Sequence, residues 1–130
     1  MGTAEAELII LTREDDGLIV GRERNFDVPR TVDRVAEAVD VTWKLAGRRP
    51  CVAIWDMRGS PRPRPESWEL FIRRIPGIFR ALAIIVDEDA KRALGAFPMA
   101  IDSLLIPVRM FVDEDEARNW IAPLAKPDPA

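Results

Sequence analysis

Short apolar runs alternate with longer amphipathic stretches along this chain, and the alternation predicts strands and helices. Two of the short runs, residues 8–12 and 18–22, flank a polar turn that ends in Asp16-Gly17. An Asp-Gly pair between two apolar runs is a strong signal for a β-hairpin. The chain is therefore expected to begin its fold with an antiparallel pair of strands.

Apolar residues at helical spacing follow this hairpin. Thr31 is a suitable N-cap, an apolar stripe runs through residues 32–46, and Gly47 supplies a stop. A second helix is expected to begin at or directly after Pro65, because proline is tolerated in the first turn. This helix should end before Pro76-Gly77.

Two further helices are expected in the C-terminal half. Acidic residues 87–89 precede a helix that begins near Ala90, and Pro98 should kink or divide it. Asp113-x-x-Glu116 resembles a capping box at the start of the last helix. Pro123 predicts that this helix ends early.

Continuous apolar runs at residues 51–55 and 81–86 are typical of buried strands, and residues 108–112 are expected to form the last strand. Strands that alternate with helices of about 10–15 residues imply parallel pairing. We expect an α/β fold with a single mixed, mainly parallel sheet of about five strands and about four helices. One domain should span residues 1–130, with a core at 5–124 and a frayed tail at 125–130.

Charge and composition exclude several classes of partner. The net charge of −3 gives no electrostatic basis for binding nucleic acid. No apolar run reaches the roughly 18 residues of a membrane span, and the first residues lack the pattern of a signal peptide. The single cysteine, Cys51, favours a reducing cytoplasm, and the excess of arginine over lysine suggests a bacterial source.

Candidate catalytic chemistry is scarce, because the chain has no histidine and no nucleotide-binding or hydrolase motif. Cys51 opens an apolar strand, which favours a packing role over a reactive thiol. The acidic runs at 87–89 and 113–116 favour helix starts over a divalent cation site. The four tryptophans lie on apolar stripes or strands, which favours the core. We therefore expect no catalytic residue, no metal and no cofactor.

Arginines gather where the chain leaves the strand at 51–55. That edge of an open α/β sheet binds ligands, and the helix start that follows favours anions. Alternatively, the arginines only keep a proline-rich loop in solvent. Asp56 either orients one of them or caps the turn. The candidate anion or partner loop comprises Asp56, Arg58, Ser60, Arg62, Arg64, Glu66 and Ser67.

The order of elements, a hairpin, a helix and then a strand at 52–56 that ends in Asp56, resembles the STAS fold of SpoIIAA-like anti-sigma-factor antagonists. More specifically, it resembles a bacterial family of small STAS-like domains of unassigned function. Some members of that family are related to the lipid-binding CRAL-TRIO fold. The resemblance rests on residues 81–86, the strand 107–111 and the helix motif Glu116-Ala-x-x-Trp120-Ile121.

STAS antagonists carry Asp-Ser-Ser-Gly at the start of the helix after the third strand, with the second serine phosphorylated. Here Arg64-Pro65-Glu66-Ser67 occupies that place, and Glu66 aligns with the phosphorylated serine. Ser67 lies one residue later and Ser60 several residues earlier. The resemblance therefore does not carry the phosphorylation switch over to this chain.

The resemblance implies a non-enzymatic, cytoplasmic regulatory or protein-interaction domain. The alternative is a carrier or sensor of a small apolar or anionic ligand. A pocket of roughly 300 Å³ or more, lined by Trp68, Phe71 and Phe97, would favour that alternative. An enzyme of unknown class is the third interpretation.

A second apolar stripe on the first helix predicts a homodimer. Ala38, Val41 and Leu45 follow one another at i, i+3 and i+7 on the side away from the main stripe, and Leu70 is similarly placed on the next helix. A two-fold contact is the commonest way to cover such a stripe. Alternatively, the stripe meets the N-terminal strand or a different protein.

Overall fold

Six strands form one sheet in the order β1-β2-β3-β4-β5-β6 in the computed structural model, which describes residues 2–94 and 104–125. The strands β1, β2 and β3 pair antiparallel, and β3 to β6 pair parallel. The strands are β1 (Gly2–Glu5), β2 (Ile9–Arg13), β3 (Ile19–Glu23), β4 (Cys51–Asp56), β5 (Phe79–Ile85) and β6 (Val108–Phe111). The helices of the described residues are α1 (Val32–Leu45), α2 (Pro65–Ile78), α3 (Glu88–Leu94) and α5 (Glu114–Ala125).

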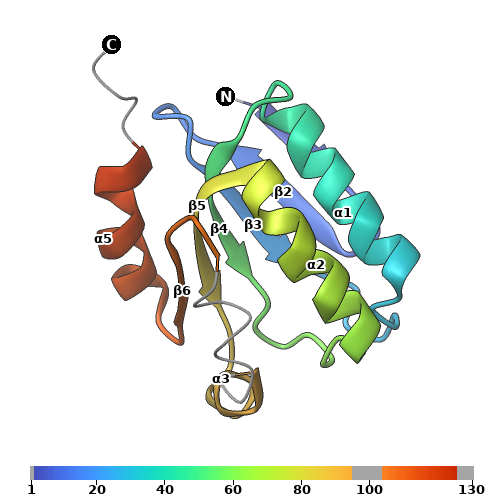
Figure 1. Cartoon of the computed structure of the whole chain (residues 1–130). Helices are drawn as coiled ribbons and strands as arrows, with labels where there is room; N and C mark the ends of the chain where they lie inside the picture. Colours follow the sequence, from blue (N-terminus) through green and yellow to red (C-terminus); the bar gives the residue numbers. More distant parts are fainter. Residues whose placement is uncertain (1, 95–103, 126–130) are drawn as a thin grey trace.

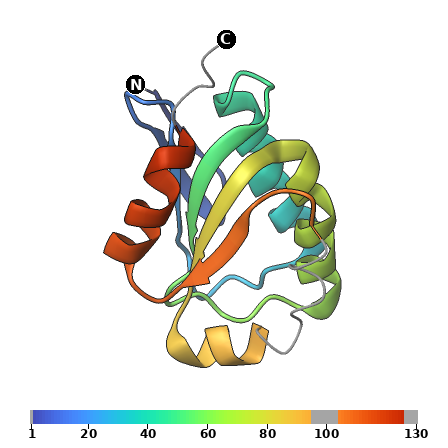
Figure 2. The same cartoon turned by 60° about the vertical axis from the view of Figure 1, so that its left-hand side comes forward.

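Helices cover both faces of this sheet, with α1 and α2 on one face and α5 on the other (Figures 1 and 2). Alternate residues of β4 serve the two layers: Ala53 and Trp55 pack with α1 and α2, whereas Val52 and Ile54 pack with α5. This explains why the central strands are continuous apolar runs. The predicted α/β fold with a mixed, mainly parallel sheet is confirmed.

Local signals located most element starts correctly. The predicted hairpin is β2–β3, paired in register from Ile9↔Glu23 to Arg13↔Ile19. The Thr31 side chain accepts a hydrogen bond from the Arg34 N–H, as an N-cap does. Asp113 likewise accepts from the Glu116 N–H at 3.0 Å.

Three expectations about element bounds were wrong. A sixth strand, β1, extends the sheet, so the expected five strands were one too few. The helix α2 continues through Pro76 to Ile78, and α5 continues through Pro123 to Ala125. Proline in a last turn removes only one intrahelical hydrogen bond, and burial of Ile78 and Ala125 compensates for it. Pro98 lies outside the described residues.

The second stripe of α1 is covered within the chain rather than open for a partner copy. Ala38 is only 1% exposed and belongs to the core, while Val41, Leu45 and Leu70 are partly buried against that core. Leu45 packs on β1, where a Cβ added to Gly2 would lie 3.3 Å from Leu45 Cδ1. The stripe therefore meets the N-terminal strand, which was the alternative interpretation. The homodimer remains a prediction, but the second stripe of α1 no longer supports it.

The described helices include none that is long and apolar enough to span a membrane. The carboxyl ends of β3, β4 and β5 meet at one edge of the sheet, together with α3 and the loops that lead into α1 and α2 (Figure 1). This carboxyl edge contains the candidate loop.

Candidate functional site

Strand alternation divides the polar residues of the carboxyl edge between two faces. Arg22 of β3 and Asp56 of β4 are Cα partners across the parallel pair and lie on the α5 side. The Asp56 carboxylate accepts hydrogen bonds from Arg22 Nη1 at 3.0 Å and from Arg58 Nη2 at 2.8 Å. Its other oxygen accepts from the Arg58 backbone N–H at 3.1 Å and from Nε at 3.0 Å. Asp56 thus both orients an arginine and caps the turn.

Glu114, in the first turn of α5, completes this cluster. Its carboxylate accepts two bonds of 2.8 Å from Arg22 in a fork geometry, one of 3.0 Å from Arg118 and one of 3.3 Å from Arg58. Arg118 also pairs with Glu14 of the β2–β3 turn at 3.2 Å. The edge network, as we call it, consists of Arg22, Asp56, Arg58, Glu114, Arg118 and Glu14.

The edge network holds both of its inner carboxylates in the charged form. Hydrogen bonds from Arg22, opposed by partial burial and assisted by Arg118, lower the pKa of Glu114 to about 2. Burial raises the pKa of Asp56, but the hydrogen bonds and charges of Arg58 and Arg22 outweigh it and leave the pKa below its ordinary value. Neither carboxyl is suited to donate or accept a proton near neutral pH.

Replacing Glu114 with glutamine should reduce the loss of unfolding free energy that occurs as the pH falls below neutral. The folded pKa of Glu114 is depressed, so its stabilisation is complete above its ordinary pKa of 4.5 and is lost as pH falls toward about 2. We expect the wild type to lose about 1 kcal/mol more unfolding free energy than Glu114→Gln between pH 6 and pH 3, after solvent screening is allowed for. Urea titrations at the two pH values measure this difference, and parallel losses in both proteins would contradict it.

On the opposite face, the edge carries a buried ion pair. Glu23 and Arg30 side chains are 7% and 2% exposed, and Arg30 Nε donates to Glu23 at 3.3 Å. The Trp55 indole N–H donates to the other Glu23 oxygen at 2.8 Å. Burial raises the pKa of Glu23 despite the opposing hydrogen bonds and the charge of Arg30.

Arg30 uses each of its five N–H bonds within the protein. Besides Glu23, it donates to the carbonyl oxygens of three loop residues and to Ser60 Oγ at 3.3 Å. Arg30 therefore ties the loop before α1 to the loop before α2, and it has no donor left for a ligand. The three carbonyls belong to Arg24, Asn25 and Val28.

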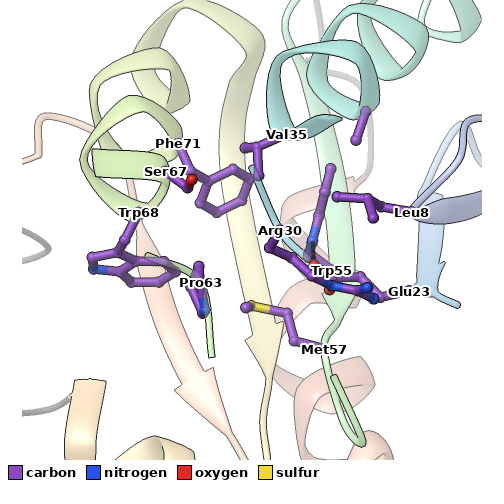
Figure 3. A pocket seen from close by; sticks show the side chains of 11 residues that line it. Leu8, Glu23, Arg30, Val35, Trp55, Met57, Pro63, Ser67, Trp68 and Phe71 are labelled. Atoms are coloured by element: carbon purple, nitrogen blue, oxygen red, sulfur yellow. Dashed lines mark hydrogen bonds and ion pairs between the residues drawn. The ribbon is translucent and has the colours of Figure 1, made fainter. Parts of the chain in front are cut away.

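A pocket lies above this pair, between α1, α2 and β4, and Figure 3 shows its lining. Its walls include Trp68 and Phe71, as expected for a ligand carrier, while Phe97 lies outside the described residues. The free space is about 20 Å³, enough for a single water molecule and far below the expected 300 Å³. Ser67 Oγ lines this space and is buried without a hydrogen-bond partner. The small volume argues against a ligand chamber here.

The outer surface of the same edge combines an aromatic ring with free positive charge. Phe26 is 48% exposed, and its ring lies over Gly59, where an added Cβ would be 3.3 Å from Phe26 Cε2. The Arg30 guanidinium lies 5.9 Å from the ring centroid. The side chains of Arg62 and Arg64 are exposed and form no hydrogen bond or ion pair with the described residues. We call Phe26, Gly59, Arg62 and Arg64 the edge surface, and the Gly59 N–H within it donates to the exposed Asp87 carboxylate at 2.8 Å.

The structure separates the predicted loop residues into three groups. Asp56 and Arg58 belong to the edge network, Ser60 and Ser67 face inward, and Arg62, Arg64 and Glu66 are exposed. Ser67 is fully buried, so a kinase has no access to its hydroxyl in this conformation.

The other candidate chemistry is structural. Cys51 is buried, and burial raises the pKa of its thiol to about 12. Within the described residues, no three histidine, cysteine or acidic side chains are grouped to hold a metal ion. Of the four tryptophans, Trp55 and Trp68 are buried, whereas Trp43 and Trp120 are partly buried against the core.

Sequence reasoning missed Glu23, Arg30 and Glu114. The sequence did contain a signal for Glu23. Strand alternation puts Glu23 on the same face as Ile19 and Gly21, which is the face covered by α1 and α2. A carboxylate buried there needs a partner. No local pattern indicates that Glu114 meets Arg22, since 92 residues separate them.

Comparison with known proteins identifies the fold and a family. The family described as a domain of unknown function, DUF7793, matches residues 16–125. A solved structure of an uncharacterised DUF3478 protein with a SpoIIAA-like fold, from Shewanella loihica PV-4, superposes with a TM-score of 0.62. The two chains are 16% identical, and the match covers 93% of this chain and 98% of the other. No curated protein matches this chain. The SpoIIAA-like fold is confirmed, whereas a relation to CRAL-TRIO proteins is not shown.

Proposed function

Because this chain belongs to the DUF7793 family, whose function is unknown, and has a SpoIIAA-like fold, we propose its role from its surface: a non-enzymatic regulatory domain that binds a protein partner. The edge surface is the contact site. The observation that carries this proposal is a half-exposed Phe26 packed on Gly59, in the loop that continues to Arg62 and Arg64, whose exposed side chains form no ion pair with the described residues. Fixed aromatic side chains and arginines are the residues that dominate binding energy at protein interfaces.

The chemistry of this surface specifies its partner. Arg22, Arg58 and Arg118 on the same edge are neutralised by carboxylates, whereas Arg62 and Arg64 pair with no carboxylate of the described ranges. An acidic segment with one apolar side chain would neutralise these two charges and cover Phe26. The net charge of −3 disfavours contact with acidic proteins elsewhere on the chain, so an acidic partner would be directed to this surface.

The non-enzymatic part of the proposal is supported by the protonation chemistry of the edge. Asp56 and Glu114 are held as ion-paired carboxylates, and the Cys51 thiol has a pKa far above neutral. We place the domain in the cytoplasm, since its single cysteine forms no internal disulfide.

Reversing the charges of Arg62 and Arg64 should abolish partner binding without unfolding the protein. The experiment places a photo-crosslinking amino acid at Phe26 in living cells of the source organism and compares the crosslinked species. We expect one discrete adduct, lost in Arg62→Glu/Arg64→Glu and retained in the control Arg73→Glu, which within the described residues pairs with the exposed Glu69 alone. Both variants should keep their unfolding free energy within about 0.5 kcal/mol. An adduct that survives the double reversal, or the absence of any adduct, would refute the contact site.

A further inference from the structure

A second polar cavity lies at the opposite, amino-terminal edge of the sheet, which faces upward in Figure 1. This open cleft has a free volume of about 300 Å³, far more than the pocket of Figure 3. Its lining combines three arginines, Arg13, Arg49 and Arg80, with an apolar floor that includes Cys51 and Val52. We call it the amino-edge cleft.

Local backbone irregularities direct the arginines into this cleft. The register between β4 and β5 passes from Cys51↔Phe79 to Val52↔Ala81, so Arg80 is the additional residue of a β-bulge. Bulges commonly re-aim a side chain beside a binding site. Arg80 is accordingly the only exposed residue of β5.

The loop that carries Arg49 is also unusual. Gly47 and Arg48 both have positive φ angles, of 74° and 58°, directly before Arg49 and Pro50. Gly47 adopts its angle without strain because it ends α1, whereas a positive φ is uncommon for a residue with a side chain such as Arg48. The third arginine, Arg13, ends β2 on the neighbouring side of the cleft.

The positive charge of the cleft is not neutralised by the described residues. None of the three arginines forms an ion pair with them. Arg13 donates one long bond, of 3.5 Å, to the Leu45 carbonyl, and Arg80 donates two to carbonyls at the end of α5, the shorter at 2.8 Å. The one acidic residue in the lining, Asp16, accepts from the Leu18 N–H of its own turn at 3.1 Å. Most guanidinium N–H groups of the cleft therefore have no acceptor among the described residues.

Arg13 and Arg80 line the same cleft as Cys51, although they come from strands that are not adjacent in the sheet. Burial dominates the raised pKa of the Cys51 thiol, and the charges of Arg80 and Arg13 both oppose this rise.

We propose that the amino-edge cleft binds a small organic phosphate. Guanidinium groups bind phosphate oxygens through paired N–H bonds, and three of them match a multiply charged anion. The apolar floor would hold the organic part, and the volume suits a molecule about the size of a mononucleotide. The site is independent of the edge surface, because it lies at the other end of the strands.

The test measures binding of adenosine monophosphate, pyrophosphate and citrate by calorimetry and by amide chemical shifts at low ionic strength. We expect the nucleotide to bind most tightly, to shift the amides of Gly17 and Cys51, and to lose about tenfold or more in affinity in Arg49→Gln and in Arg13→Gln. The control is Arg73→Gln, on the exposed surface of α2, which should leave binding unchanged. Arg80 is left intact, because its bonds to α5 make it part of the fold.

Three results would overturn the proposal. The first is no binding of any of the three probes up to about 5 mM. The second is binding that Arg49→Gln and Arg13→Gln leave unchanged. The third is citrate binding as tight as that of the phosphates, which would show a general anion cleft without selection for phosphate.

Discussion

Replacing Arg30 with methionine is expected to lower the free energy of unfolding by about 3–5 kcal/mol, because it leaves a buried carboxylate without its counter-charge. Arg30 is 2% exposed and all five of its N–H bonds have acceptors in the protein. The change also removes the hydrogen bonds that Arg30 donates to three loop carbonyl oxygens. Urea denaturation at pH 7 measures the loss.

The matched control for this change is Arg34→Met, four residues later. Arg34 is one-third exposed and pairs with the more exposed Glu7 at 3.2 Å, so its loss should cost less than about 1 kcal/mol. Equal losses in the two variants would show that burial does not amplify the Arg30 interactions.

The sign of the pH dependence gives a further check on Arg30→Met. The pKa of Glu23 is already raised by burial, and removing the Arg30 charge raises it further. A raised pKa gives stability that is present at low pH and is lost as pH rises through the folded pKa. The variant should therefore recover stability relative to the wild type on acidification.

The parts of the fold that local chemistry determines were predictable from the sequence. The Asp-Gly turn between two apolar runs determined the β2–β3 pairing, and Thr31 and Asp113 determined the starts of α1 and α5. Continuous apolar runs identified β4 and β5, because alternate residues of each strand enter two different cores.

The parts that depend on tertiary contact were not predictable. The strand β1 has no apolar alternation of its own and is stabilised by pairing with β2 and by contact with Leu45. Pro76 and Pro123 each predict a helix end, yet burial of Ile78 and Ala125 extends both helices past them.

The candidate site was predictable only in outline. Strand-to-helix topology predicts a ligand or partner contact in the loop after β4 and treats its arginines as one group. The structure divides them, because Asp56 and Glu114 bind Arg58 but leave Arg62 and Arg64 exposed. That division depends on α5, more than fifty residues away along the chain, so no pattern near the loop contains it.

Replacing Asp56 with alanine is expected to cost about 2–3 kcal/mol of unfolding free energy. The Asp56 carboxylate is 9% exposed and accepts four hydrogen bonds, all from Arg22 and Arg58. Hydrogen bonds to charged groups contribute more than neutral ones, and one of the four caps the turn after β4. Arg22 keeps its fork contact with Glu114, which prevents a larger loss.

The control for Asp56→Ala is Asp87→Ala, which removes a bond to the same turn from the residue that precedes α3. The exposed Asp87 carboxylate accepts one bond from the described residues, from the Gly59 N–H at 2.8 Å, so its loss should cost about 1 kcal/mol or less. Calorimetric melting of both variants at pH 7 measures the difference. If Asp87→Ala is as damaging as Asp56→Ala, the turn depends on the bond between Gly59 and Asp87 as much as on the edge network. In that case the arginines around Asp56 would not by themselves hold in place the loop that carries Arg62 and Arg64.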